Sequence, residues 1–161
     1  MSLTTGYRVV LADDHIPFRQ GLRKVLEQDT GLKVVGEAGD GLELVALLKE
    51  IIAHMVILDL SMPNMDGFEA AREIKKIYPD INILILTMHK EAEYALQAIS
   101  AGARGYVVKE NADQELFHAM KTVREGGLYF PLLAGKKIVN PAESWRFPGE
   151  KVRRDFKGGI S

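Results

Sequence analysis

The chain has 161 residues, and 47% of them are hydrophobic, which is enough for a packed core. It contains no cysteine, so disulfides and thiolate metal sites are excluded. The longest apolar stretches are well short of the ~20 residues of a membrane helix, and the N-terminus lacks the pattern of a signal peptide, so we expect a cytoplasmic protein with no membrane contact.

The net charge of −1 conceals an asymmetry along the chain. Residues 131–161 hold seven of the 21 Lys and Arg residues but only three of the 22 Asp and Glu residues. Hydrophobic periodicity also ends near residue 130. We therefore predict a domain over residues 7–130 and a basic linker or tail over residues 131–161. The tail is either a solvated, partly disordered segment or a connection toward a nucleic-acid-binding module or an acidic partner.

Within the predicted domain, apolar runs alternate with segments of helical spacing. Pro17 suits the first turn of a helix, Asp40 suits an N-cap, and Gly102 suits the end of a helix. The expected strands cover residues 9–12, 34–38, 55–59, 82–87 and 104–109. The expected helices cover residues 16–28, 40–52, 68–78, 91–100 and 113–125.

Five strands separated by helices predict an α/β fold, a (βα)5 doubly wound sheet of parallel strands joined by right-handed crossovers. The first, third and fourth strands are almost wholly apolar, as expected for strands covered on both faces. The second strand is less apolar, which places it at or near an edge of the sheet.

Polar residues of different kinds follow four of these strands. Asp13 and Asp14 follow the first strand and Asp59 the third, while Thr87 and Lys109 end the fourth and fifth. The carboxyl ends of parallel strands share one edge, where open α/β sheets place their sites. Three carboxylates, a hydroxyl and an amine at that edge suit a divalent cation, most simply Mg²⁺, and a phosphoryl group.

Asp59 is the best candidate for a nucleophile, because it stands alone after a very apolar strand. Its attack on phosphorus would give an aspartyl phosphate. Lys109 would then neutralise a phosphoryl oxygen, and Thr87 would donate a hydrogen bond to another. Taken singly, these residues have simpler interpretations: Asp14 and Thr87 as helix caps, and Lys109 as a solvated surface amine.

At these positions the chain resembles the receiver domain of bacterial two-component response regulators, over residues 7–130. The combination of Asp-Asp after the first strand, Asp after the third, Thr after the fourth and Lys after the fifth is very specific to that family. Local segments are similar to the NarL/LuxR-type branch: Leu-Ala-Asp-Asp-His at 11–15, Phe-Arg-Gln-Gly-Leu at 18–22, Gly-Glu-Ala at 36–38, Leu-Asp-Leu-Ser-Met-Pro at 58–63, Leu-Thr-Met-His at 86–89 and Ala-Gly-Ala-Arg-Gly-Tyr at 101–106.

The resemblance implies a flavodoxin-like strand order of 2-1-3-4-5 and a role for each site residue. Asp59 would accept a phosphoryl group from a sensor histidine kinase. Asp14, Asp59 and the backbone carbonyl of Ser61 would hold Mg²⁺, with Asp13 acting mainly through water. Lys109 would contact the phosphoryl group, and Thr87 and then Tyr106 would move toward it as switch residues. Phosphorylation would change a surface formed by the fourth helix, the fifth strand and the fifth helix, or by the first and fifth helices, with homodimerisation as one outcome.

Two positions depart from the general receiver pattern. Glu110 follows the final Lys where many receivers have Pro, which favours the NarL-type branch. Met88 stands where many receivers carry a small residue, so its thioether is expected to shield the phosphoryl group from water and slow autodephosphorylation. His15 and His89 flank the site, but we expect surface or steric roles for them.

Family members of this branch usually continue into a helix-turn-helix domain that reads DNA, and residues 132–161 offer no such helix pair. Control of transcription would therefore need an output domain that this chain does not contain. A Mg²⁺-dependent aspartyl-phosphate phosphatase is the main alternative. Such enzymes usually place an acid/base Asp two residues after the nucleophile, where this chain has Ser61. A flavin-binding module is rejected, because Asp13 and Asp14 would repel the flavin phosphate.

Overall fold

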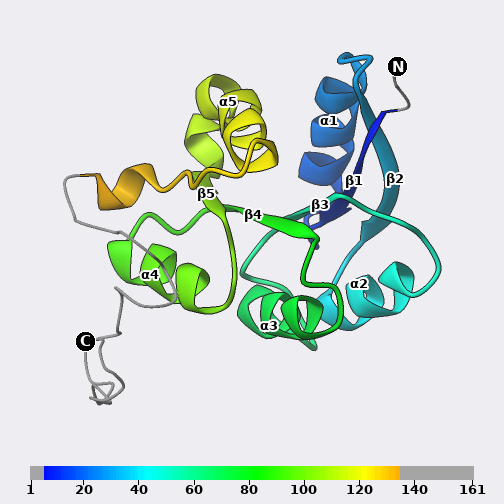
Figure 1. The fold of residues 1–161 in the computed structure, drawn as a ribbon, viewed down its shortest axis with the longest axis horizontal. Coiled ribbons are helices and arrows are strands. Elements are labelled where there is room, and N and C mark those ends of the chain that lie inside the picture. Colours follow the sequence, from blue (N-terminus) through cyan, green and yellow to red (C-terminus); the bar gives the residue numbers. More distant parts are fainter. Residues whose placement is uncertain (1–5, 135–161) are drawn as a thin grey trace.

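A computed structural model describes residues 6–134. Its centre is one sheet of five parallel strands in the order β2-β1-β3-β4-β5, which confirms the predicted fold class and strand order (Figure 1). The second strand lies at an edge, as expected. The strands are β1 (Tyr7–Ala12), β2 (Leu32–Ala38), β3 (Met55–Leu58), β4 (Asn82–Thr87) and β5 (Gly105–Val108).

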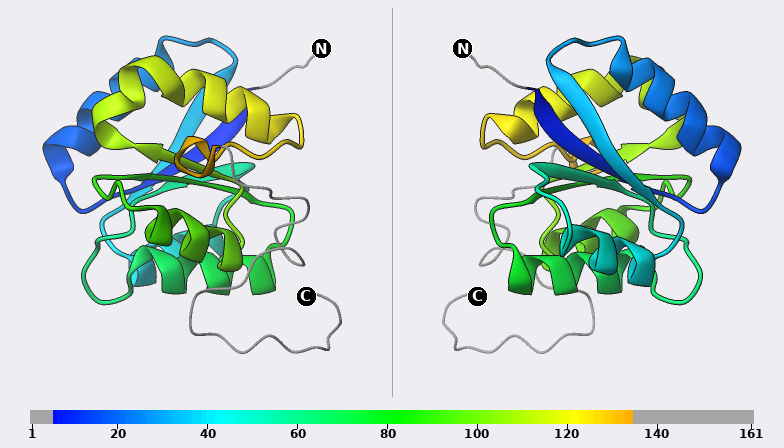
Figure 2. Two further views of the ribbon diagram at one scale, coloured as in Figure 1. Left: turned by 90° about the vertical axis from the view of Figure 1, so that its left-hand side faces the viewer. Right: turned by 90° about the vertical axis from the view of Figure 1, so that its right-hand side faces the viewer.

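Helices cover both faces of the sheet, so the domain has three layers (Figure 2). Helices α1 and α5 pack on one face, and the other three helices pack on the opposite face. Within residues 6–134 no helix is long and apolar enough to cross a membrane. The helices are α1 (Ile16–Glu27), α2 (Gly41–Leu48), α3 (Gly67–Ile77), α4 (Ala92–Ser100) and α5 (Ala112–Arg124), with 3₁₀ turns at Lys109–Asn111 and Pro131–Leu133.

Burial of the central strands explains why their sequences are almost continuously apolar. All four residues of β3 are buried, and in β4 only Asn82 is partly exposed. Successive side chains of a strand point to opposite faces. Val56 and Ile83 therefore join the core beneath α2, α3 and α4, while Met55 and Leu84 join the core beneath α1 and α5. A sheet anchored on both faces gives its carboxyl edge a fixed position.

Helix α2 is shorter than the sequence pattern predicted. The apolar spacing continues to Ile52, but the helix ends at Leu48, and the next two residues are held by shorter i→i−3 hydrogen bonds. The carbonyl of Ile52 accepts a hydrogen bond from Arg8 Nε at 2.7 Å, and the backbone N–H of His54 donates to the Arg8 carbonyl. Contacts with β1 therefore redirect the chain before the helical pattern ends. The predicted N-cap is confirmed: the Asp40 carboxylate accepts from the Glu43 N–H at 2.8 Å.

Ordered packing continues beyond residue 130, where the predicted domain ended. The backbone of Tyr129 pairs with the open edge of β5, with Tyr106 donating to its carbonyl at 2.8 Å. Leu133 then lies buried in the core that α4 covers, with only 2% of its surface exposed. The rest of the predicted basic tail, from residue 135 onward, lies outside the described residues.

Candidate functional site

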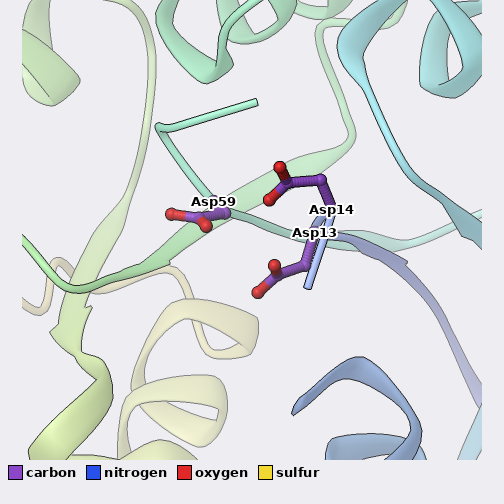
Figure 3. Close-up of side chains that lie close together, drawn as sticks. All are labelled: Asp13, Asp14 and Asp59. Atoms are coloured by element: carbon purple, nitrogen blue, oxygen red, sulfur yellow. The ribbon is translucent and has the colours of Figure 1, made fainter. Parts of the chain in front are cut away.

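Asp13, Asp14 and Asp59 come together at the carboxyl edge of the sheet (Figure 3). One carboxylate oxygen from each residue lies within 4.8 Å of the other two. Asp13 and Asp59 are buried, whereas Asp14 is exposed. Three like charges at this separation repel one another strongly unless cations balance them. The cluster is therefore suited to a cation that takes oxygen ligands.

The sheet register explains why these residues meet. Ala12 at the end of β1 lies beside Leu58 at the end of β3, so the residues that follow leave the sheet side by side. The Asp59 N–H donates to the Ala12 carbonyl at 2.9 Å, and the Asp13 N–H donates to the Ala38 carbonyl at 3.0 Å. The last hydrogen bonds of the sheet therefore fix the backbones of both buried carboxylates.

Lys109 supplies a positive charge inside the cluster. Its Nζ lies 2.7 Å from Asp13 Oδ2 and 3.2 Å from Asp59 Oδ2, and 8% of its side chain is exposed. The same ammonium lies 4.3 Å from the centroid of the Phe18 ring, in cation–π geometry. Burial by itself would lower the pKa of Lys109, but Asp13 and Asp59 outweigh it and raise the pKa, so the amine is charged at neutral pH.

The environment of Asp59 favours its protonated form more than water does. Burial raises the pKa of this carboxyl group, and the charge of Asp13 raises it further, although Lys109 opposes both effects. An added cation would lower this pKa again, because it stabilises the carboxylate. The ionisation of the Asp59 carboxyl group therefore depends on the cations around it.

Thr87 and Ser61 complete the polar lining of this edge. The Thr87 hydroxyl is fully buried and makes no hydrogen bond of normal geometry among the described residues, yet it lies near enough to Asp59 to help lower the pKa of that carboxyl group. A buried hydroxyl without a partner is costly, so it suits a group that completes its hydrogen bonding. The Ser61 N–H lies 3.4 Å from Asp59 Oδ1, a long contact. Both sequence-predicted residues therefore border the carboxylate cluster.

Tyr106 connects this edge to the loop after β4. Its side chain is fully buried in β5, and its hydroxyl donates to the His89 carbonyl at 2.9 Å. Burial raises the pKa of this phenol, so the hydroxyl is protonated and donates. The His89 ring lies 2.8 Å (Nε2) from Ser61 Oγ and stacks on Tyr94 at 4.3 Å between centroids. His89 therefore links both loops that border the cluster, a role the sequence analysis missed.

Two predicted residues lie at the rim. Met88 directly follows the buried Thr87 at the end of β4, and 70% of its surface is exposed. Glu110 forms an exposed ion pair with Lys90 at 3.2 Å. Such surface pairs contribute little to stability.

The simpler interpretations of the single residues fail against the geometry. Helix α1 has His15 at its N-cap position, and α4 has Glu91 there, so neither Asp14 nor Thr87 caps a helix. Lys109 is buried and ion-paired rather than solvated. Asp13 does have a local structural contact, since its Oδ1 accepts the His15 N–H at 2.9 Å.

Comparison with known proteins identifies the class of domain. The family model described as "Response regulator receiver domain" matches residues 9–121, and the chain belongs to this family. The chain is 38% identical over 133 residues to the uncharacterized transcriptional regulatory protein YxjL of Bacillus subtilis, covering 83% of this chain and 61% of YxjL. It is 40% identical over 121 residues to the response regulator UvrY of Escherichia coli K12, covering 75% of this chain and 56% of UvrY.

Solved structures agree with this assignment. A LuxR-family two-component response regulator from Aurantimonas sp. SI85-9A1 is 38% identical, with a TM-score of 0.74 over 77% of this chain and 89% of that one. The isolated receiver domain of RcsB from Salmonella enterica serovar Typhimurium, solved with the phosphomimetic BeF₃⁻, is 33% identical with a TM-score of 0.73, over 78% of this chain and 94% of that one. The curated relatives are longer, and the chain spans about 50–60% of their length.

Proposed function

We propose that this domain receives a phosphoryl group on Asp59 from the phosphohistidine of a sensor histidine kinase. The observation that supports this most directly is the convergence of Asp13, Asp14, Asp59, Lys109 and the unpartnered Thr87 hydroxyl at one edge of the sheet. An Asp59 oxygen would form the bond to phosphorus while the bond to the kinase histidine nitrogen breaks and that nitrogen keeps the electron pair.

The donor set fits Mg²⁺, which binds carboxylates and keeps several waters. Asp13, Asp14, Asp59 and the backbone carbonyl of Ser61 would hold it. When bound, the ion would neutralise charge on Asp59 and on the phosphoryl oxygens.

The remaining residues have distinct roles in this proposal. Lys109 is charged and buried next to Asp59, so it would pair with one phosphoryl oxygen. The Thr87 hydroxyl would donate to another oxygen and gain the partner it lacks. A shift of Thr87 would leave room for Tyr106 to move, and the Tyr106–His89 hydrogen bond would carry the change to the loop before α4.

In this account the domain is a switch in the cytoplasm with two conformations, and phosphorylation changes their populations. The phosphorylated surface would favour homodimers. Control of transcription would need a DNA-binding output domain, and several of the longer relatives are named as transcriptional regulatory proteins. Apart from its own phosphorylation and slow autodephosphorylation, the domain would catalyse no reaction.

Beryllofluoride, which mimics a phosphoryl group on a carboxylate, provides the test. The full chain is titrated with beryllofluoride in the presence of Mg²⁺ while amide NMR signals are recorded. We expect saturable shifts at Asp59, Thr87 and Tyr106. Asp59→Asn should abolish them, whereas Asp80→Asn, the same change at an exposed position, should not. Shifts that persist in Asp59→Asn would contradict the proposal, and continuous hydrolysis of external phosphoesters would favour the phosphatase alternative.

A further inference from the structure

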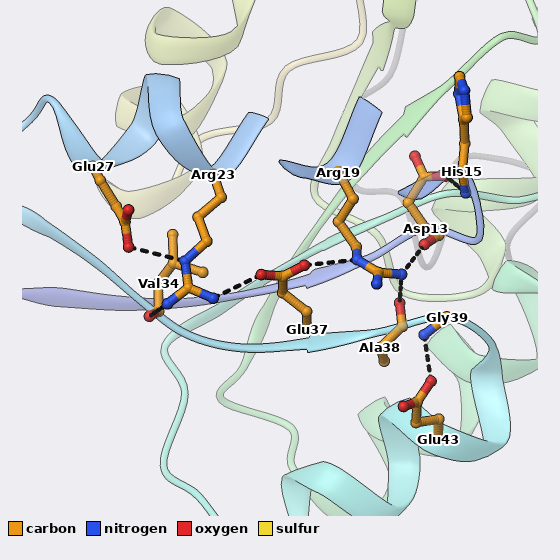
Figure 4. Close-up of polar contacts among 10 residues, drawn as sticks. All are labelled: Asp13, His15, Arg19, Arg23, Glu27, Val34, Glu37, Ala38, Gly39 and Glu43. Atoms are coloured by element: carbon orange, nitrogen blue, oxygen red, sulfur yellow. Dashed lines mark hydrogen bonds and ion pairs between the residues drawn. The ribbon is translucent and has the colours of Figure 1, made fainter. Parts of the chain in front are cut away.

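Arg19 of α1 makes several contacts next to the carboxylate cluster, and the proposed function gives it no task. Its Nη1 donates to the Asp13 carbonyl at 2.5 Å and to the Ala38 carbonyl at 3.2 Å, while its Nε donates to Glu37 Oε1 at 2.7 Å (Figure 4). Only 15% of the side chain is exposed. Arg19 therefore joins the end of β2 to the loop that carries Asp13 and Asp14.

The carbonyl that Arg19 binds has a particular place in the chain. It belongs to the peptide unit that connects Asp13 to Asp14, and this unit is planar. Fixing the carbonyl oxygen fixes the orientation of the whole plane and thereby the Cα of Asp14. The Asp13 N–H is already bound to Ala38, so the backbone is held on both sides of Asp13.

Asp14 depends on this backbone support more than its neighbours do. Asp13 and Asp59 are buried and paired with Lys109. The Asp14 side chain is exposed, and within residues 6–134 its carboxylate has no hydrogen bond or ion pair. Its direction toward the other two carboxylates is therefore set by the path of the loop.

Glu37 keeps the charge of Arg19 from opposing a cation. Its carboxylate lies between two guanidinium groups, with Arg23 Nη1 at 2.7 Å from Oε2 (Figure 4). Burial alone would raise the pKa of Glu37, but Arg23 and Arg19 hold it below its usual range. Glu37 is thus ionised at neutral pH. Because Arg23 also pairs with Glu27 at 3.0 Å, the Glu37 charge balances that of Arg19 beside the cluster.

We propose that Arg19 is a positioning residue for the metal, which holds the Asp13–Asp14 peptide so that the Asp14 carboxylate faces the cluster before the ion arrives. This inference rests on the proposed Mg²⁺ site. Residues that orient metal ligands without touching the metal change its affinity by about tenfold or more when they are replaced. Loss of Arg19 should therefore weaken Mg²⁺ binding although Asp13, Asp14 and Asp59 are all still present in the chain.

The test compares two arginines that share Glu37 as a partner. The full chain and its Arg19→Gln and Arg23→Gln variants are titrated with Mg²⁺ alone. Binding is monitored through the amide NMR signals of Asp14 and Asp59. Arg23 touches β2 but not the Asp13 loop, which makes it a matched control. We expect about tenfold weaker binding in Arg19→Gln and wild-type affinity in Arg23→Gln. Arg19→Lys, which keeps one donor for the Asp13 carbonyl, should recover part of the affinity.

Phosphorylation by acetyl phosphate provides a second readout. In Arg19→Gln the rate should need more Mg²⁺ to reach half its maximum but should reach the wild-type rate at saturation. Wild-type Mg²⁺ affinity in Arg19→Gln would overturn the inference, even if the variant unfolds at a lower temperature. Equal losses in both arginine variants would also overturn it. If Arg19→Gln does not fold, Arg19→Lys against Arg23→Gln provides the same comparison. Failure of the wild-type chain to bind Mg²⁺ would instead refute the proposed function.

Discussion

Replacing Lys109 with Met tests how much the Lys109 charge stabilises the three carboxylates of the cluster. Methionine keeps much of the length and packing of lysine but removes the charge. In the native domain the ammonium lies 2.7 Å from Asp13 Oδ2 and 3.2 Å from Asp59 Oδ2. Without it, these two carboxylates and Asp14 would face one another with no positive charge between them.

The expected loss in the free energy of unfolding can be worked out from these two distances. At an effective dielectric constant of about 20, the attractions to Asp13 and Asp59 amount to about 6 and about 5 kcal/mol. Desolvation of the three groups offsets much of this, and removing one partner of a buried pair typically costs about 3–5 kcal/mol. We therefore expect Lys109→Met to lower the free energy of unfolding by about 3 kcal/mol in the absence of Mg²⁺.

Urea unfolding with EDTA and with Mg²⁺ measures both parts of the prediction. A ligand that binds only the folded state stabilises it according to its affinity. Because Lys109 competes with Mg²⁺ for the same carboxylates, Mg²⁺ should stabilise Lys109→Met more than the wild type. Lys90→Met is the control, because its pair with Glu110 is exposed and contributes about 1 kcal/mol or less. The reasoning is refuted if Lys109→Met loses no more stability than Lys90→Met, or gains no more from Mg²⁺ than the wild type.

Three further predictions concern single residues. Burial raises the pKa of Asp59, so the folded state binds this proton more tightly than the unfolded state does, and the stability that the group contributes is lost as pH rises from the usual pKa of 3.8 through the raised pKa. Over this pH range the urea midpoint should fall less in Asp59→Asn than in the wild type. An identical pH profile in the two proteins would contradict this prediction. Met88→Ala should shorten the lifetime of the aspartyl phosphate, which is measured from the loss of the phosphoryl group over time. An equal or longer lifetime would refute the shielding role. Leu133→Ala should lower the free energy of unfolding by about 2–4 kcal/mol, because Leu133 is buried in the main core; a chemical denaturation midpoint like that of the wild type would show that the segment after α5 is dispensable.

Local sequence patterns predicted the sheet and its polar edge well. The buried strands β3 and β4 are nearly all apolar, and each ends where a polar residue begins, so the pattern and the structure follow the same physical rule. Once the strands are parallel, their carboxyl ends must share an edge. Because β1 and β3 are also neighbours in register, Asp13, Asp14 and Asp59 lie close together.

Contacts between distant segments could not be predicted in this way. Lys109 lies over the ring of Phe18 in α1, and the His89 ring meets Ser61, because segments that follow different strands converge on one edge. Nothing in the spacing of these residues encodes such pairs. The burial of Leu133 was missed for a related reason, since a short segment of irregular sequence has no periodicity to reveal the surface it covers.

The central claim is that Asp59 forms the covalent bond to phosphorus. The most direct measurement treats the full chain with acetyl phosphate and Mg²⁺ and follows the intact mass, with peptide mapping to locate the modification. The account predicts the addition of one phosphoryl group, carried by Asp59, dependent on Mg²⁺ and absent from Asp59→Asn. A phosphoryl group on another residue, or none in the presence of Mg²⁺, would contradict it.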